Sequence, residues 1–144
     1  MPGATVAIGG VSASNVVVVD QWTISCTAPA HPLGTGNVVV TNPGVASGTW
    51  SGQFTWLAPV ITSVTPNSGP SQGGTTVSIV GANFHPGAAV MIGFSLATSV
   101  TVQNPGLITC TVPSQIPGTP TTTWVSVTNP GGVSAVMSAA FIYN

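Results

Sequence analysis

The stretch PVITSVTPNSGPSQGGTTVSIVGANF, residues 59–84, decides the fold of this chain. Its two apolar segments, Val60–Val64 and Thr75–Val80, are short, partly alternating and rich in β-branched residues, which is typical of β-strands. Two prolines between them restrict the loop, and Gly73-Gly74 suits a turn that needs a positive φ. The stretch therefore predicts two strands joined by a rigid loop.

The rest of the chain contains the later part of one repeat twice. Residues 4–57 match residues 88–144 at a shift of 84 positions, which becomes 87 after an insertion. Matches at a nearly constant spacing are typical of tandem structural units. We therefore expect an incomplete repeat over residues 1–57 and a complete one over residues 58–144. The first repeat has no counterpart of residues 59–84.

Short β-branched segments also recur outside this stretch. Clusters of Pro, Gly, Asn and Ser separate them, and no segment keeps a helical period beyond a turn or two. Strands spaced in this way indicate a β-sandwich. The further predicted strands are residues 16–19, 23–27, 37–41, 100–102, 108–112 and 124–128.

A specific sequence motif begins at Pro59. It reads P-x-I-x-x-V-x-P-x-x-G-P-x-x-G-G-T, and it is followed by VSIVGANF (77–84), ITCTVP (108–113) and FIY (141–143). In these residues the chain resembles the IPT/TIG family, an immunoglobulin-like domain of plexins, some transcription factors and many bacterial and phage surface proteins. The resemblance implies an all-β chain of tandem immunoglobulin-like sandwiches, the first lacking its opening strands.

Charged residues are almost absent from the chain. It has no Lys or Arg and one acidic residue, Asp20, whereas about a quarter of an average chain is charged. Binding to nucleic acid and to anionic membranes both depend on Lys and Arg, so neither is expected. No apolar run approaches the roughly 18 residues that span a bilayer, so membrane insertion is not expected either. This composition suits an extracellular protein, at a cell surface or on a virion.

The missing strands of the first repeat give the main indication of function. Without them, apolar core residues and strand edges lack partners, and such edges pair readily with other chains. We expect strand complementation by neighbouring copies, and a contact that does not close on itself forms a filament. The residues expected in assembly are Ala4, Val6, Ile8, Val60, Ile61, Val64, Val77 and Ile79.

Exchange of strands between copies has a counting problem. Each chain holds two late halves but only one early half, residues 59–87, so exchange alone leaves one late half uncovered. Either the first unit closes by packing on the surface of a neighbour, or the polypeptide begins upstream of Met1.

Catalysis is not expected, because titratable side chains are few. No pair of carboxylates is present for glycoside hydrolysis, and a lone Asp does not make a calcium site. No nucleophile motif accompanies the acidic residue or either histidine. We predict a protein that is not an enzyme and has no cofactor or metal. The titratable groups considered are Asp20, Cys26, His31, His85, Cys110 and Tyr143.

Cys26 and Cys110 occupy equivalent positions in the two repeats. Equivalent positions of two domains lie far apart, so a disulfide within the chain is not expected. Two buried free thiols are the first interpretation, and a bridge between subunits is the alternative.

The four tryptophans, Trp22, Trp50, Trp56 and Trp124, are candidate ligand contacts. We expect most of them in cores or subunit contacts, and Trp50 is the one expected to be exposed, because small residues surround it. Exposed aromatic rings stack on sugars, and IPT/TIG-like domains often accompany carbohydrate-active modules. The alternative to a structural subunit is therefore a module of a larger adhesin or glycan-active protein that binds a cell-surface glycan through Trp50.

A threonine-rich tract precedes the last predicted strands. It is either a loop leading into a strand or an O-glycosylation site. The candidate acceptors are Thr119, Thr121, Thr122 and Thr123.

Overall fold

The computed structural model describes residues 2–44 and 46–144, and the chain divides into two compact units. Unit 1 is Met1–Leu57 and unit 2 is Ala58–Asn144. Every helix or strand assigned within the described residues is a β-strand. The predicted all-β fold class is therefore confirmed.

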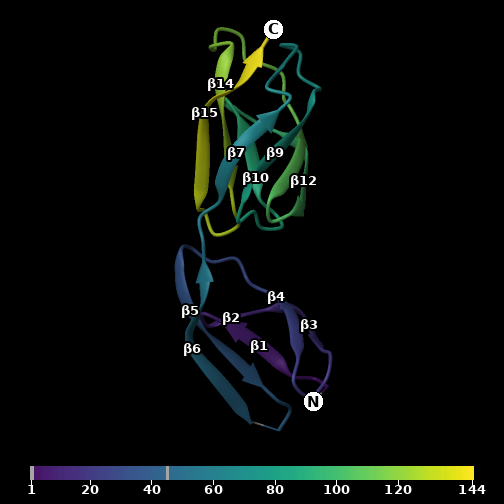
Figure 1. Ribbon diagram of the computed structural model, residues 1–144, viewed down its shortest axis with the longest axis vertical. Helices are drawn as coiled ribbons and strands as arrows, with labels where there is room; N and C mark the ends of the chain where they lie inside the picture. The colour runs from purple at the N-terminus through teal and green to yellow at the C-terminus, as the bar shows by residue number, and fades with distance from the viewer. Residues whose placement is uncertain (1, 45) are drawn as a thin grey trace. The chain divides into compact units, whose positions relative to one another are not determined.

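Unit 2 is a sandwich of two sheets (Figure 1). Its strands are β7 (Val60–Thr65), β8 (Ser68–Gly69), β9 (Thr76–Ala82), β10 (Ala89–Ile92), β11 (Ser95–Leu96), β12 (Thr98–Asn104), β13 (Leu107–Thr111), β14 (Thr122–Thr128) and β15 (Ser134–Tyr143). One sheet has the order β11-β10-β14-β15-β8 and the other the order β12-β13-β9-β7. All neighbours are antiparallel except β15 and β8, which are parallel.

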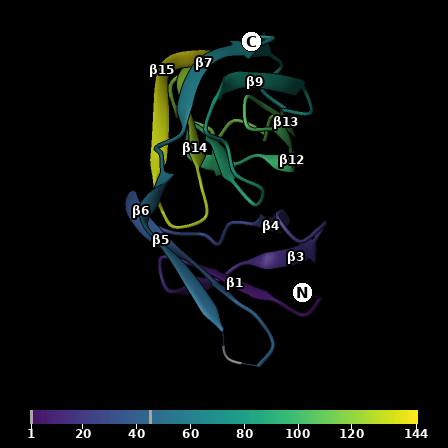
Figure 2. The same ribbon diagram turned by 60° about the horizontal axis from the view of Figure 1, so that its bottom comes forward.

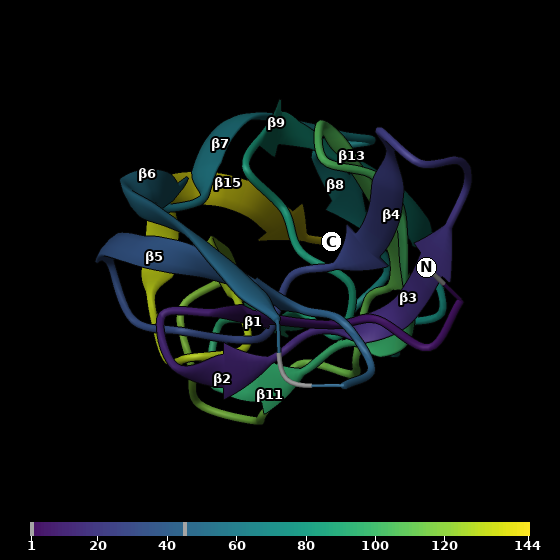
Figure 3. The ribbon, with the colours of Figure 1, turned by 90° about the horizontal axis from the view of Figure 1, so that it is seen from below.

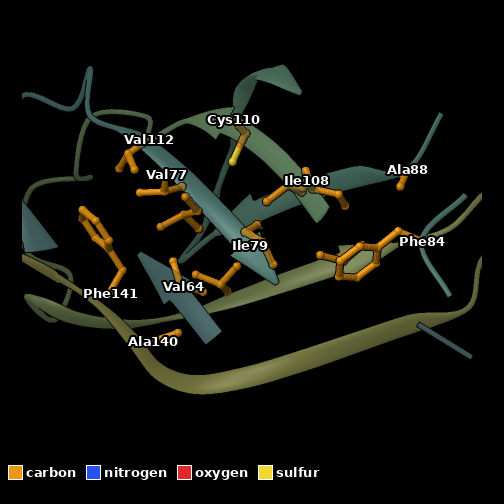
Figure 4. Packing of buried hydrophobic residues seen from close by; sticks show 14 of the residues in the cluster. Val64, Val77, Ile79, Phe84, Ala88, Ile108, Cys110, Val112, Ala140 and Phe141 are labelled. Atoms are coloured by element: carbon orange, nitrogen blue, oxygen red, sulfur yellow. The ribbon is translucent and has the colours of Figure 1, made fainter. Parts of the chain in front are cut away.

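The alternation of side chains along β9 and β13 builds the core of unit 2. Val77 lies opposite Cys110 and Ile79 lies opposite Ile108, and all four side chains are buried. The intervening Ser78 points away from the core, as the period of two in a strand requires. Figure 4 shows these side chains gathered with those of the neighbouring strands between the two layers. Each such fully buried aliphatic side chain contributes about 1.5–3 kcal/mol through the hydrophobic effect.

Two glycine positions explain part of the motif in the opening stretch. Gly73 and Gly74 have φ values of 78° and 88°, which glycine adopts without strain. Gly81 pairs with Ile61 where β9 runs beside β7, and a Cβ there would meet the carbonyl oxygen of Val60 and the ring of Phe84. The motif thus encodes one turn and one close approach between strands.

Unit 1 has two smaller sheets. Its strands are β1 (Thr5–Ile8), β2 (Val11–Ser12), β3 (Ser14–Val18), β4 (Ile24–Thr27), β5 (Gly34–Thr41) and β6 (Ser47–Trp56). One sheet has the order β2-β1-β5-β6, and β3 and β4 form the other. Figures 2 and 3 show β3 and β4 as a hairpin separate from the sheet that contains β1 and β5.

The strands of unit 1 repeat those of unit 2 from β10 onward. Val6 pairs with Val40 in unit 1, and Val90 pairs with Val127 at the equivalent positions of unit 2. The strands β1 to β6 therefore correspond in order to β10 to β15. In the described part of unit 1, β7, β8 and β9 have no counterpart.

Candidate functional site

Two strand edges of unit 1 are open because the described part of this unit contains no counterpart of β7–β9. In unit 2, β13 pairs with β9 and the end of β15 pairs with β8. The equivalent strands of unit 1 are β4 and β6. Among the residues described there, β4 pairs only with β3, and β6 pairs only with β5. These edges can accept an added strand.

Five core positions that are fully buried in unit 2 are only half-buried in unit 1, where the described residues include no strand like β9 to cover them. The equivalent pairs, with unit 1 first, are Ile24 and Ile108, Cys26 and Cys110, Val38 and Val125, Val40 and Val127, and Phe54 and Phe141. We call the unit 1 members of these pairs the open face. The open face is therefore an apolar, partly exposed surface whose equivalent in unit 2 lies inside the core.

Trp50 lies beside the open face, on β6. It pairs with Val38, whose side chain packs on the core of unit 1. Directly paired residues of antiparallel strands point to the same side of the sheet, so Trp50 is on the inner side. In unit 2 the equivalent pair is Val125 and Met137, and Met137 packs against the core. Trp50 is 61% exposed because the strands that cover Met137 have no counterpart over it.

The tip of the β3–β4 hairpin is uncovered as well. The backbone N–H of Trp22 donates to Asp20 Oδ1 at 2.7 Å, and the N–H of Gly106 donates to Asn104 Oδ1 at 2.8 Å in unit 2. Asp20 is therefore a turn residue. In unit 2 the carbonyl of Gly106 accepts a hydrogen bond of 2.9 Å from the N–H of Gly81 in β9. The described part of unit 1 has no strand to supply that donor.

Trp50 is exposed, as expected from the small residues around it, and a second tryptophan is exposed as well. Trp22 is 87% exposed, more than Trp50, because the tight turn places it at the tip of an uncovered hairpin. Trp56 is buried and Trp124 is half-buried.

The residues predicted for assembly lie mostly inside the two folded units. They hold the strands together and are not accessible surfaces. Val60 is the exception, with 50% exposure. Ile61 is half-buried, and the buried ones are Ala4, Val6, Ile8, Val64, Val77 and Ile79. Matching the repeats identified which strands are missing, but it did not identify the residues that those strands leave uncovered.

The threonine tract is divided by burial. Thr123 is buried and faces Gly93, and the Oγ1 of Thr119 donates to the carbonyl of Ile116 at 2.6 Å. Thr121 and Thr122 are exposed. On the folded chain, an O-linked sugar is sterically compatible with these two residues and incompatible with Thr123.

Both cysteines are free thiols, in different surroundings. Cys110 is buried in the core of unit 2, and this burial raises the pKa of its thiol to about 11. Cys26 is half-buried on the open face. A thiol reagent therefore reaches Cys26 first, because reactivity requires access and the thiolate form.

The titratable side chains do not converge on one site. His31 stacks on Trp56 with ring centroids 4.1 Å apart, and its Nδ1 lies 2.7 Å from the carbonyl oxygen of Pro32. The Oδ1 of Asp20 accepts the turn hydrogen bond described above. Within residues 2–44 and 46–144, no group of three His, Cys, Asp or Glu is placed to hold a metal ion.

A shallow groove lies on the outer face of the sheet formed by β10, β14 and β15, and sequence reasoning did not find it. Met91, Ser126 and Val136 form a row across these strands, and Trp124 lies beside them, edge-on to Phe94 at 6.1 Å. Its lining combines one aromatic ring, two aliphatic side chains and several hydroxyls: Met91, Trp124, Ser126, Thr128, Ser134, Val136 and Ser138.

The two-sheet sandwich of unit 2 has the architecture of an immunoglobulin-like domain. The family model of the IPT/TIG domain matches residues 1–56 and residues 59–143. The chain belongs to the IPT/TIG domain family.

Two similar solved structures share this fold. The plexin A4 full extracellular region is 22% identical with a TM-score of 0.61, and the match covers 97% of this chain and 14% of that chain. SGBP-B from a complex xyloglucan utilization locus in Bacteroides uniformis is 24% identical with a TM-score of 0.54, covering 96% of this chain and 41% of that chain. This chain therefore spans less than half of either protein. None of the described residues belongs to a helix long and apolar enough to cross a membrane.

Proposed function

We propose that this chain is a non-enzymatic structural subunit of an extracellular filament or virion surface, joined to neighbouring copies through the open face of unit 1. One observation carries the proposal. Unit 1 reproduces the strand register of β10–β15, yet the five core positions of its open face stay half-buried because no strand in the described part of unit 1 covers them.

Physical chemistry favours association through this face. Exposed apolar faces and unpaired strand edges both gain free energy when another chain covers them. The formal net charge is −1, so repulsion between copies is weak. One copy can pack its open face on another surface of a neighbour, which avoids the shortage of opening strands and leaves the neighbour's own open face free to extend the filament.

The surroundings of the titratable groups support a role without catalysis. Asp20 is engaged in a turn, Cys110 lies in a core, and His31 is stacked on Trp56. An extracellular location is supported by the fold, which the extracellular region of plexin A4 shares. Coverage of only part of that protein supports a modular role.

Sedimentation velocity over a range of concentrations, followed by negative-stain electron microscopy, tests this function. We expect oligomers that grow with concentration and ordered filaments or lattices on the grid. The substitution Trp50→Ser should weaken association, whereas Val136→Ser, an exposed apolar residue of unit 2, should not. A monomer at every concentration would overturn the proposal.

The outer groove favours a second candidate function, binding of a neutral glycan at a cell surface. An aromatic ring beside hydroxyl groups, without charge, suits stacking on a sugar and hydrogen bonding to it. The sequence analysis placed this contact at Trp50, but the groove contains Trp124. A glycan array with Trp124→Ala and Trp50→Ala variants separates the two positions. Binding that is lost only in Trp124→Ala supports the groove, and no binding to any glycan removes this candidate.

A further inference from the structure

The open face has its complement in the same chain. In unit 2, β9 places Val77 opposite Cys110 and Ile79 opposite Ile108. The counterparts of Cys110 and Ile108 in unit 1 are Cys26 and Ile24, which have the same identities. The surface left open in unit 1 is thus the one that β9 covers in unit 2.

We propose that the open face is the docking site for a polypeptide segment with the chemistry of residues 59–84, the opening strands of an IPT/TIG repeat. This inference rests on the proposed function and deepens it, because it names the partner of the same face. The donor is uncharged and extended, and it runs antiparallel to β4 with a Val opposite Cys26 and an Ile opposite Ile24. Backbone hydrogen bonds along β4 supply affinity, and the alternate side chains that enter the core supply specificity.

The hairpin tip provides a second point of attachment. In unit 2 the N–H groups of Gly81 and Phe84 donate to the carbonyls of Gly106 and Pro105, each at 2.9 Å. The equivalent carbonyls of unit 1 belong to residues 22 and 21. A donor that fills β4 in the same register brings its counterparts of Gly81 and Phe84 to this tip, beside Trp22.

The end of β6 provides a third point of attachment for the donor. In unit 2, Ser68 and Gly69 of β8 pair in parallel with Ile142 and Tyr143 of β15. The equivalent residues of β6 are residues 55 and 56. A donor that contains the Ser-Gly pair therefore bridges both sheets of unit 1, which a single strand along β4 does not.

A second copy of this chain is a poor source of these strands. Its residues 59–84 already cover the core of its own unit 2. Val90, Ile108 and Phe141 are fully buried there, in one cluster with side chains of these strands. If a copy withdrew these strands to cover the unit 1 of a neighbour, it would uncover the core of its own unit 2. The exchange would bury no additional apolar surface. The segment that docks on the open face is therefore one that does not already cover a repeat of its own.

A synthetic peptide of residues 59–84 is the direct probe. It contains neither Trp nor Cys, so changes in tryptophan emission or thiol reactivity report on the chain alone. Alkylation of the intact chain by iodoacetamide, followed by mass spectrometry, measures Cys26, and the buried Cys110 serves as the internal reference. The matched control peptide carries Val77→Thr and Ile79→Thr, which keep β-branching and remove the apolar side chains.

The wild-type peptide should slow alkylation of Cys26 about tenfold at a concentration of about ten times its Kd, because only the free chain reacts. Emission of Trp22 and Trp50 should shift to shorter wavelength, and the control peptide should do neither. Equal rates with no peptide, the control and the wild-type peptide would overturn the inference.

Sedimentation of the same samples separates this inference from the proposed function. Protection of Cys26 with loss of oligomers supports both proposals. Protection of Cys26 in a chain that never forms oligomers supports the donor site and overturns association between copies. Oligomers without protection of Cys26 overturn the donor site and leave association between copies in place.

Discussion

The indole Nε1 of Trp56 donates a hydrogen bond of 3.0 Å to the carbonyl oxygen of Pro29. In unit 2 the hydroxyl of Tyr143 donates to the carbonyl oxygen of Pro113, also at 3.0 Å, and both partners occupy the equivalent positions. Two different aromatic side chains thus close the same end of each unit with the same bond. The two units are built alike at this end, and the difference between their described parts is confined to the face that β7–β9 cover in unit 2.

The hydrogen bond of Tyr143 should contribute to the stability of unit 2. We expect Tyr143→Phe to lower its free energy of unfolding by about 1 kcal/mol, because the carbonyl of Pro113 loses its donor while the ring still packs. Urea unfolding followed by circular dichroism measures the change. Ile142→Val at the neighbouring position, which keeps β-branching on a side chain that is 40% exposed, is the control and should change stability by less than about 0.5 kcal/mol. A result in which both variants unfold alike would contradict this role of the hydroxyl.

The same substitution at equivalent positions should have unequal effects. Ile108→Ala removes a fully buried side chain and should destabilise unit 2 by about 2–5 kcal/mol. Ile24→Ala should cost unit 1 less than about half of this, because Ile24 is half-buried and loses fewer contacts. Denaturant unfolding of both variants, with tryptophan emission and circular dichroism as probes, gives the comparison. An equal loss would mean that Ile24 is already covered in solution.

The repeat pattern predicted the fold because both copies obey the same local rules. Gly9 and Gly93 both have a φ of 61°, so residues 84 apart share one conformation. Exposure was harder to predict, because it depends on strands that one copy has and the other lacks. Trp50 and Met137 occupy equivalent positions, yet only Met137 is packed against a core. The side of the sheet on which Trp50 lies follows from its pairing with Val38, which the sequence alone did not show.

The close approach of β7 and β9 should make Gly81 intolerant of substitution. A Cβ at this position would meet the carbonyl oxygen of Val60 and lie 2.5 Å from the ring of Phe84. We expect Gly81→Ala to destabilise unit 2 by about 2 kcal/mol or more, because the backbone of β7 must move. Gly48→Ala is the matched control, since no atom lies within 4 Å of a Cβ there, and it should be neutral or slightly stabilising. Thermal unfolding measures both, and a Gly81→Ala protein as stable as the control would show that β7 is not held as described.

Alkaline pH should lower the free energy of unfolding of unit 2. Burial raises the pKa of Cys110 to about 11 from an ordinary value of 9.0, and burial also raises the pKa of Tyr143. Below an unfolded-state pKa each group is protonated in both states, and its contribution is fully present. As pH rises from about 9 to about 11, the unfolded chain releases the Cys110 proton first, so stability falls across this window.

The variants Cys110→Ala and Tyr143→Phe isolate the two groups. Each lowers stability at neutral pH, so the quantity to compare is the slope of the unfolding free energy against pH. We expect Cys110→Ala to flatten the loss between about pH 9 and pH 11, and Tyr143→Phe to flatten its upper part. Cys26→Ala is the matched control, and it removes a half-buried thiol from unit 1 without touching the core of unit 2. If Cys110→Ala leaves the slope unchanged, the buried thiol is not the group that makes unit 2 sensitive to alkali.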